Sequence, residues 1–427
     1  GASAMATEVT KAKVATSKLI SQGHDSFELI FMMLMGIRTA VGKFASATCN
    51  HVGPQEFNQK WEGDFVGQGS PETPAHSHAD FKFKDYAPLV FRQLRERFGI
   101  TAQDYMLSLT SEYVLVEMFT NSKSGSFFFY SADYRFVLKT CTKREAAFLM
   151  AALPQYHAHL MQHRFTLLCR FFGLHRVHHR SGKRVYFAVM GNVFPIDKPI
   201  HERYDLKGST RNRFTTDAER QDPNVVLKDL DFINARRKLQ LGDDKKRRLL
   251  TQIKKDCELL ERLEVIDYSM LIGIHRSASS TTSRRGPRPA SMFYKVAAGG
   301  AEAGGGKSDA GKIAGGLWEA EQQRRAAVQI VDTVSQEELH EQISRKTRAG
   351  DDASSDVSDG MEPAELYKEV YYVGVIDILC EYGLKKQLEH HYKAAKHGEK
   401  VGAQNFSVVD PLQYSTRFQN FIADGLA

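Results

Sequence analysis

The stretch YYVGVIDILCEYG, residues 371–383, joins an apolar run rich in β-branched residues to a single acid, Asp377. Valine, isoleucine and tyrosine at this density predict a buried strand. A carboxylate in an apolar strand is costly if it is left unpaired. We therefore expect Asp377 to meet a lysine, a hydrogen-bond network or a metal ion in the folded chain.

A second acid stands in similar surroundings. The segment IDYSMLIGIH, residues 266–275, places Asp267 just before another apolar run that predicts a buried strand. Between the two acids lie residues 277–360, whose glycine-rich and serine-rich composition cannot bury a core and predicts a disordered insert. Two acids on either side of one insert suggest one shared site.

Composition limits the class of protein and of partner. The 427 residues suffice for a large core, in one domain of two lobes or in two domains. The formal charge of +7 predicts an anionic partner, which charge alone leaves open between nucleic acid, an acidic membrane and a phosphorylated substrate. Five scattered cysteines without CxxC spacing indicate neither a disulfide framework nor a zinc site. No apolar run approaches the roughly 20 residues of a membrane span, so any membrane contact should be peripheral.

Helical and strand patterns occur in runs along the chain. Residues 87–100, 144–164 and 243–265 predict helices, the second interrupted near Pro154. A β-hairpin is predicted over 124–140, and further strands over 166–177, 184–194 and 225–232, whereas 51–78 reads as a polar loop. This arrangement favours an α+β fold over a doubly wound one.

The predicted hairpin carries a small-residue turn and a strand lysine. In SKSGSFFFYSADYRFVLKT, residues 122–140, the turn joins two strands and the second strand ends in Lys139. Kinases use such a turn and lysine to hold nucleotide phosphates. The full GxGxxG pattern is absent, and the pattern alone favours an ordinary hairpin.

A second charged turn, YDLKGSTRNR, covers residues 204–213. Asp205, Lys207 and Arg213 lie around a glycine-permitted bend, a composition suited to holding phosphates and orienting other charged groups. A solvated turn is the alternative reading of this segment.

Six motifs occur together in one order: GHDSFELIFMMLMGIRTAVG, DFKFKDYAPLVFRQLRERFGI, YDLKGST, VLKDLDF, IDYSMLIGIH and YYVGVIDIL. Together they resemble the phosphatidylinositol phosphate kinase family over nearly the whole chain. The resemblance implies an α+β lipid-kinase fold of two lobes with antiparallel sheets, distantly similar to protein kinases. It implies an N-terminal lobe at 21–195 and a C-terminal lobe at 196–427 that contains the insert. Residues 1–20 are expected to be a tail that opens on a cloning remnant, GASAM.

The resemblance also implies ATP and magnesium as cofactors and gives roles to single residues. Lys139 would pair with the ATP phosphates, Asp267 would be the catalytic acid and Asp377 would hold magnesium. Asp205 and Lys207 would line the same site. The phosphate loop and the nucleotide hinge would be formed by Ser124, Gly125, Ser126, Met190, Asn192 and Val193.

The lipid substrate would be read by basic residues and one acid. By resemblance, Arg213 and Lys228 are candidates for binding the inositol phosphate. The family's LKDNDF motif appears here as LKDLDF, residues 227–232, so that Leu230 replaces its asparagine. After Asp377, apolar residues recur at helical spacing and lysines fill the other positions, a pattern that suits an anionic bilayer surface. This segment contains the remaining substrate candidates, Lys385, Lys386 and Glu389.

Glu389 bears most directly on the reaction. It falls where the branch that phosphorylates the 5-hydroxyl of phosphatidylinositol 4-phosphate has glutamate and the other branch has alanine. This favours a 5-kinase that makes phosphatidylinositol 4,5-bisphosphate. Other segments, such as KEVYYVGVIDIL and VDPLQYSTRF, resemble the other branch more closely, which keeps a phosphatidylinositol 5-phosphate 4-kinase as the alternative.

Two rivals come from other classes of protein. A non-catalytic phosphoinositide-binding scaffold would keep the basic surface, but retention of Lys139, Lys207, Asp267 and Asp377 argues against it. Nucleic-acid binding is not expected, because no recognised module is present. We expect a cytoplasmic enzyme at the cytosolic face of membranes. The choice between ATP and GTP and the oligomeric state, with a homodimer as one option, stay open.

Overall fold

The computed structural model describes residues 18–19, 26–47, 51–110, 115–118, 126–194, 198–278, 367–382 and 409–427. Gly1–His275 and Tyr371–Ala427 belong to one compact unit, and the described residues outside it are 276–278 and 367–370. Nearly all described residues, and every site residue discussed below, belong to this unit. The predicted insert lies outside the described residues apart from the end of one strand.

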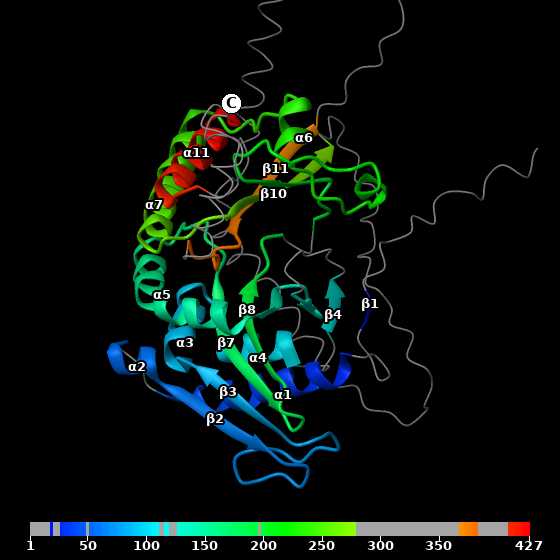
Figure 1. Cartoon of the computed structure of the whole chain (residues 1–427), viewed down its shortest axis with the longest axis vertical. Helices are drawn as coiled ribbons and strands as arrows, with labels where there is room; N and C mark the ends of the chain where they lie inside the picture. Colours follow the sequence, from blue (N-terminus) through cyan, green and yellow to red (C-terminus); the bar gives the residue numbers. More distant parts are fainter. Residues whose placement is uncertain are drawn as a thin grey trace, which may run out of the picture. The chain divides into compact units, whose positions relative to one another are not determined.

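An eight-stranded antiparallel sheet dominates the first 191 residues, with the strand order β1-β4-β5-β6-β8-β7-β3-β2 (Figure 1). In β2, every second residue is buried, as expected when one face of a sheet covers a core. The strands are β1 (Lys18–Leu19), β2 (Lys60–Phe65), β3 (Phe81–Tyr86), β4 (Leu115–Met118), β5 (Phe128–Ser131), β6 (Phe136–Cys141), β7 (Phe171–His179) and β8 (Arg184–Gly191).

The core lies between one face of this sheet and two helices, α1 (Phe27–Phe44) and α4 (Ala102–Thr110). Helix α1 approaches the sheet closely at Gly36, where a Cβ atom would come within 2.0 Å of the Phe83 ring. Glycine is therefore required at this crossing. The other face of the sheet carries α5 (Lys143–Gln162), next to α2 (Pro54–Asn58) and α3 (Pro88–Arg97).

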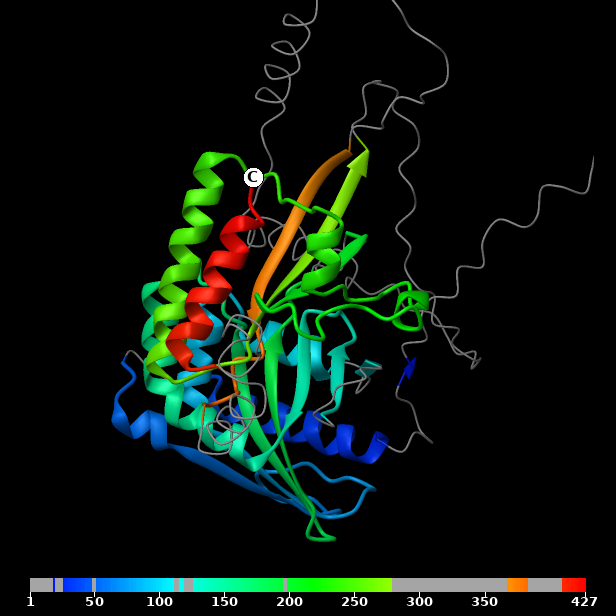
Figure 2. The same cartoon turned by 45° about the horizontal axis from the view of Figure 1, so that its top comes forward.

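The chain beyond residue 200 contains a three-stranded sheet in the order β11-β10-β9. Its strands are β9 (Glu202–Leu206), β10 (Ser269–Ala278) and β11 (Tyr367–Ile376), and Figure 2 shows β10 and β11 side by side. The helical elements of this part are η1 (Glu219–Gln221), α6 (Asp229–Asn234), α7 (Asp243–Arg262) and α11 (Pro411–Asp424).

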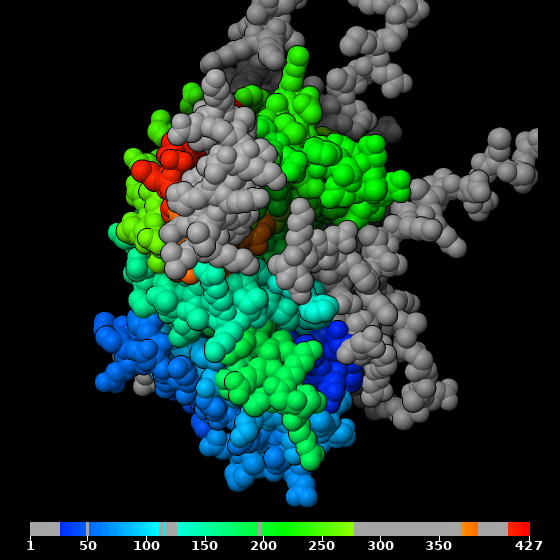
Figure 3. All heavy atoms as spheres, viewed as in Figure 1, coloured from blue at the N-terminus to red at the C-terminus, as the bar shows by residue number. Residues whose placement is uncertain are grey.

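Helix α11 packs against α7 and lies at the surface beside it (Figure 3). Its buried Tyr414 and Phe418 contact the Tyr268 ring, with centroids 4.7 and 5.0 Å apart. The mixture of helices and antiparallel strands confirms the α+β class. The lobe boundary at residue 195 stays a prediction. None of the helices that the structure describes is long and apolar enough to cross a membrane.

Three local predictions were wrong. Helix α5 runs unbroken through Pro154, because Leu153 and Tyr156 beside it are buried and hold the helix in place. The predicted loop at 51–78 contains α2 and β2. The predicted strand at 225–232 ends in α6, because the Asp231 carboxylate accepts the Lys228 amide at 2.9 Å and caps a helix start.

A buried carboxylate ties three segments together. Asp256 on α7 is 1% exposed. Its oxygens accept hydrogen bonds from the Thr166 hydroxyl at 2.8 Å and the Leu167 amide at 2.7 Å, and Oδ1 lies 2.6 Å from His159 Nε2 on α5. The segment that contains Leu167 hydrogen-bonds in turn to Val375, two residues before Asp377. Asp256 therefore fixes the start of β7 against the end of β11.

Replacing this carboxylate should destabilise the protein strongly. We expect Asp256→Ala to lower the free energy of unfolding by about 3–5 kcal/mol, because buried donors lose their acceptor. Urea denaturation followed by circular dichroism would measure it. Glu258→Ala, at an exposed position of the same helix, is the matched control and should change it by less than about 0.5 kcal/mol. A loss below about 1 kcal/mol for Asp256→Ala would contradict the assigned role.

Candidate active site

Lys139 lies between two carboxylates. It stands on β6 opposite Ala188 of β8, and only 10% of its side chain is exposed. Its Nζ is 3.7 Å from Asp377 Oδ1 and 3.8 Å from Glu145 Oε1. The strand lysine of the first sheet and the acid that follows β11 therefore lie in one site, although 238 positions separate them in the sequence.

The sequence reasoning missed Glu145. This residue is in the first turn of α5, where its Oε2 accepts the Thr142 amide at 2.7 Å while the Thr142 hydroxyl accepts the Glu145 amide at 3.1 Å. This reciprocal capping box fixes the helix start and holds Glu145 beside Lys139. The T-x-x-E pattern at 142–145 was the signal that could have found it.

The pair between Lys139 and Glu145 should matter for nucleotide binding more than for stability. We expect Glu145→Gln to keep the cap but weaken ATP binding about ten-fold, because Lys139 loses one of its two carboxylate partners. Fluorescent-nucleotide titration would measure the dissociation constant. Arg144→Gln, which removes an exposed pair with Glu381, is the control. Unchanged nucleotide affinity in Glu145→Gln would contradict this role.

A second ion pair joins Lys207 and Asp267. Lys207 Nζ donates to Asp267 Oδ1 at 2.8 Å and to the Asp267 carbonyl oxygen at 2.7 Å. The antiparallel register explains the meeting, because Leu206 at the end of β9 pairs with Met270 near the start of β10. Lys207, which follows β9, therefore lies beside Asp267, which precedes β10.

The turn that carries Lys207 is built around Asp229, whose side chain is fully buried. Asp229 Oδ1 accepts the amides of Lys207 at 2.9 Å and Gly208 at 2.7 Å. Gly208 has φ +69°, and a Cβ there would come within 3.0 Å of the Arg417 carbonyl oxygen. Glycine is therefore needed, and the DLKGS turn is fixed by a buried acid.

Arg213 completes this turn. Its Nε donates to Asp229 Oδ2 at 2.7 Å and its Nη2 to Asp205 Oδ1 at 2.9 Å. Lys228 also forms an ion pair, with its Nζ 3.0 Å from Glu219 Oε1. The structure therefore gives both predicted inositol-phosphate ligands a carboxylate partner, and their role toward the substrate stays a prediction.

The two acids of the site share an unusual backbone conformation. Asp267 has φ 67° and Asp377 has φ 62°, in the left-handed region that non-glycine residues rarely occupy. Such a conformation costs on the order of 1–3 kcal/mol and persists where the surroundings enforce it, often at functional sites.

Electrostatics links Asp377 to both ion pairs. Burial raises the pKa of Asp377, Lys139 and Lys207 oppose the rise, and Asp205 and Asp267 add to it. Nevertheless, 48% of the side chain is exposed, so solvent and ligands can reach the carboxylate within dense protein surroundings. Two ammonium groups and two further carboxylates thus act on the Asp377 carboxylate.

Comparison with known proteins places the chain in a family. A family model described as phosphatidylinositol-4-phosphate 5-kinase matches residues 109–425. The chain belongs to this family. A probable phosphatidylinositol phosphate kinase from Dictyostelium discoideum is 37% identical to the chain over 96% of its length and 59% of the relative. For phosphatidylinositol 4-phosphate 5-kinase 6 from Arabidopsis thaliana the identity is 37% over 94% of this chain and 54% of the relative.

A third relative, phosphatidylinositol 4-phosphate 5-kinase its3 from Schizosaccharomyces pombe, is 33% identical over 95% of this chain and 54% of its own length. The chain therefore spans somewhat more than half the length of these three relatives. The recognition of the phosphatidylinositol phosphate kinase family from sequence motifs is confirmed.

The predicted nucleotide hinge of this family member begins at the end of β8 and continues beyond the strand. Met190 is near the end of the strand, and the Asn192 amide and side-chain nitrogen donate to the carbonyls of Arg135 and Tyr134 at 3.0 and 2.9 Å. Val193 packs against Gly374 of β11, where a Cβ would come within 2.8 Å of it. Ser126 precedes β5 as expected of the phosphate loop. The other loop and substrate candidates, Ser124, Gly125, Lys385, Lys386 and Glu389, lie outside the described residues.

The oxygen donors of the site fit magnesium. Asp377, Asp267 and Asp205 offer carboxylate oxygens, the ligands that magnesium prefers. Within the part of the chain that the structure describes, no group of three or more histidine, cysteine or acidic side chains is arranged to hold a metal ion. Magnesium usually binds one or two carboxylates and takes its other ligands from water and substrate phosphates. The site of this family member suits that mode.

Proposed function

We propose that this chain is a phosphatidylinositol-4-phosphate 5-kinase, which transfers the γ-phosphoryl group of ATP to the 5-hydroxyl of phosphatidylinositol 4-phosphate and makes phosphatidylinositol 4,5-bisphosphate. The observation that carries the proposal is the meeting of Lys139, Asp377, Lys207 and Asp267 in one accessible site of a member of this family. Two relatives that are named as 5-kinases support the choice of reaction.

Phosphoryl transfer needs positioning and charge rather than covalent chemistry by the protein. The Lys139 ammonium, held by Glu145 and Asp377, is placed to bind nucleotide phosphates. Asp267 is the carboxylate that would orient the lipid hydroxyl and accept its proton. Lys207, which is hydrogen-bonded to Asp267, adds positive charge where negative charge develops.

Asp377 would hold magnesium, with Asp267 and Asp205 near enough to influence its charge. The ion would supply positive charge that neutralises the transferring phosphoryl group. The proposal assigns the predicted roles of Lys385, Lys386 and Glu389 to substrate recognition, with peripheral contact at an anionic cytosolic membrane face. A homodimer remains a prediction that sedimentation velocity would test.

The reaction can be tested with labelled ATP and one lipid at a time. The purified chain, γ-labelled ATP and vesicles that contain phosphatidylinositol 3-, 4- or 5-phosphate would be incubated, and the product isomer identified by chromatography after deacylation. We expect phosphatidylinositol 4-phosphate to be the preferred substrate and the 4,5-bisphosphate to be the product. Preference for the 5-phosphate would establish the 4-kinase alternative, and no transfer to any lipid would favour a scaffold.

Glu389 should set the preference between the two lipids. We expect Glu389→Ala to lower the ratio of kcat/KM for phosphatidylinositol 4-phosphate over the 5-phosphate at least about ten-fold, which corresponds to ~1.4 kcal/mol of discrimination. The same vesicle assay measures this ratio, with Gln387→Ala from the same segment as control. An unchanged ratio would remove Glu389 from the role of substrate reader.

A further inference from the structure

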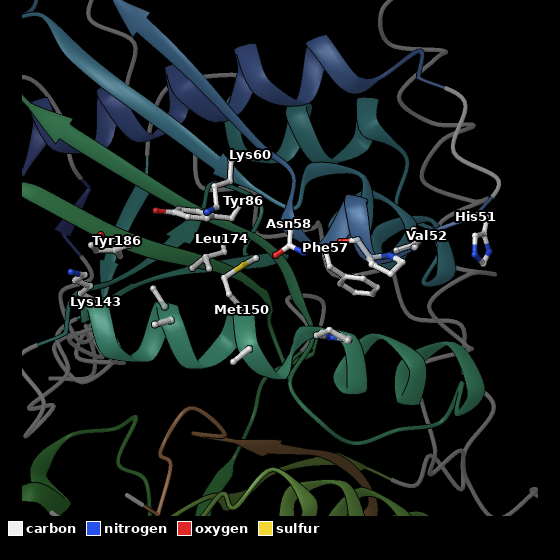
Figure 4. A pocket seen from close by; sticks show the side chains of 16 residues that line it. His51, Val52, Phe57, Asn58, Lys60, Tyr86, Lys143, Met150, Leu174 and Tyr186 are labelled. Atoms are coloured by element: carbon white, nitrogen blue, oxygen red, sulfur yellow. Dashed lines mark hydrogen bonds between the residues drawn. The ribbon is translucent and has the colours of Figure 1, made fainter.

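A cavity of about 840 Å³ lies apart from the candidate active site. It opens between α5, α2 and the strands β3, β7 and β8, and Figure 4 shows Met150 of α5 pointing toward the strands that carry Tyr86 and Leu174. This volume is typical of sites for small organic ligands. The proposed phosphoryl transfer makes no use of it.

The cavity and Lys139 lie on the same face of the eight-stranded sheet. One row of paired residues crosses that face from Tyr86 through Leu174 and Ala188 to Lys139. Neighbouring strands are about 4.8 Å apart, so the backbone of Tyr86 is about 14 Å from that of Lys139. The two sites are thus separate but share the face that α5 covers.

Helix α5 contributes residues to both the candidate active site and the cavity. Glu145, in its first turn, contacts Lys139, whereas another stripe of the helix faces the cavity. The members of that stripe recur at helical spacing, and most are small: Lys143, Ala146, Ala147, Met150, Ala151 and Pro154. A ligand in the cavity would therefore contact the helix that carries Glu145.

The walls combine apolar surface with two lysines. Phe57, Leu174 and the α5 stripe supply the apolar part. Lys60 and Lys143 also line the cavity, and no described carboxylate forms an ion pair with either of them. The neighbouring lysines of β3, in contrast, are neutralised: Lys82 pairs with Asp64 and Lys84 with Glu62.

Two tyrosines add hydrogen-bond donors. The rings of Tyr86 and Tyr186 line the cavity with centroids 6.5 Å apart. Burial raises the pKa of Tyr86 to about 12. Its hydroxyl is therefore protonated at neutral pH, as that of an ordinary tyrosine is. These phenols and the two lysines can bind an anionic group, while the alanine stripe of α5 accommodates an apolar body.

We propose that this cavity binds a small amphipathic anion, an apolar chain that ends in one carboxylate or phosphate group. Charge complementarity with Lys60 and Lys143 selects an anion over a neutral or cationic molecule. The alanines and Met150 select an apolar chain over a nucleotide, whose polar base and ribose would lose hydrogen bonds to water there. The proposal goes beyond the kinase reaction and does not depend on it.

Fluorescence can test this binding directly. The probe is dansyl-undecanoic acid, whose emission shifts to the blue in an apolar site, titrated into the full chain. We expect saturable binding at one site, displacement by laurate, by dodecyl phosphate or by both, and no displacement by ATP. Displacement by only one of the two competitors identifies the headgroup as carboxylate or phosphate. Displacement by neutral methyl laurate as effective as that by laurate would overturn the anion assignment.

Variants locate the site. Ala147→Trp and Ala151→Trp, both at exposed positions of the α5 stripe, fill the cavity and should weaken probe binding more than ten-fold. Ala158→Trp, exposed on the same helix outside the cavity, is the matched control and should bind the probe normally. Normal binding by both cavity variants, or no saturable binding by the unchanged chain, would refute the proposal.

The lysines are tested separately. The double variant Lys60→Glu with Lys143→Glu should weaken probe binding about ten-fold, the combined effect of two exposed charge contacts. Lys183→Glu, at the exposed tip between β7 and β8, is its control. If the double variant binds the probe as tightly as the Lys183→Glu control does, Lys60 and Lys143 do not hold the anionic group and the proposal fails.

Discussion

Asp377→Asn should reduce phosphoryl transfer to lipid by about 1000-fold or more, while binding to phosphoinositide vesicles stays close to that of the unchanged chain. Asparagine keeps the shape of the side chain but removes the negative charge that would hold magnesium. The vesicle-binding candidates, Lys385 and Lys386, are not altered. Labelled-phosphate transfer and vesicle sedimentation would measure the two properties side by side.

The control for this variant is Asp217→Asn, which changes an exposed acid outside the site. We expect it to keep full activity. The fold should survive in both variants, because nearly half of the Asp377 side chain is exposed. Transfer by Asp377→Asn within about ten-fold of the unchanged rate would remove Asp377 from the metal role.

Asp267→Asn should lower kcat by about 10²–10⁴-fold, the usual contribution of a positioned acid or base. Lys207 Nζ keeps its hydrogen bond to the main-chain carbonyl of residue 267, so the turn should hold its shape. The loss should therefore fall on kcat and leave KM for ATP nearly unchanged. Single-turnover transfer to phosphatidylinositol 4-phosphate would separate the chemical step from substrate binding.

Asp222→Asn, outside the site, serves as the control for this second variant. A rise in KM with unchanged kcat would show that Asp267 binds substrate and does not take part in the chemical step. A large fall in thermal stability would indicate that the pair with Lys207 is structural. Either result would contradict the assignment of Asp267 as the catalytic acid.

Local patterns predicted the elements that carry the site. The hairpin of β5 and β6, the helix α7 and the strands next to Asp267 and Asp377 each have a strong signal of periodicity or β-branched composition. The expectation that each acid has a partner followed from the cost of an unpaired carboxylate. The structure supplies Lys139 for Asp377 and Lys207 for Asp267.

The partners of several site residues depend on tertiary packing and could not be predicted from the sequence. Glu145 has an ordinary capping pattern, and only the position of α5 over β6 brings it to Lys139. Nothing in the sequence distinguishes Asp229 from the other acids nearby, yet its side chain is buried and accepts the Gly208 amide of the turn. Arg213 shows its charge in the sequence but not its carboxylate partners.

In the proposed enzyme, Lys139, Asp267 and Asp377 form one site for magnesium and nucleotide. Electron paramagnetic resonance of Mn²⁺, used in place of magnesium together with a non-hydrolysable ATP analogue, tests it most directly. We expect one tightly bound ion that requires the nucleotide and is lost in Asp377→Asn. Equally tight ion binding in Asp377→Asn, or binding that does not depend on the nucleotide, would contradict it.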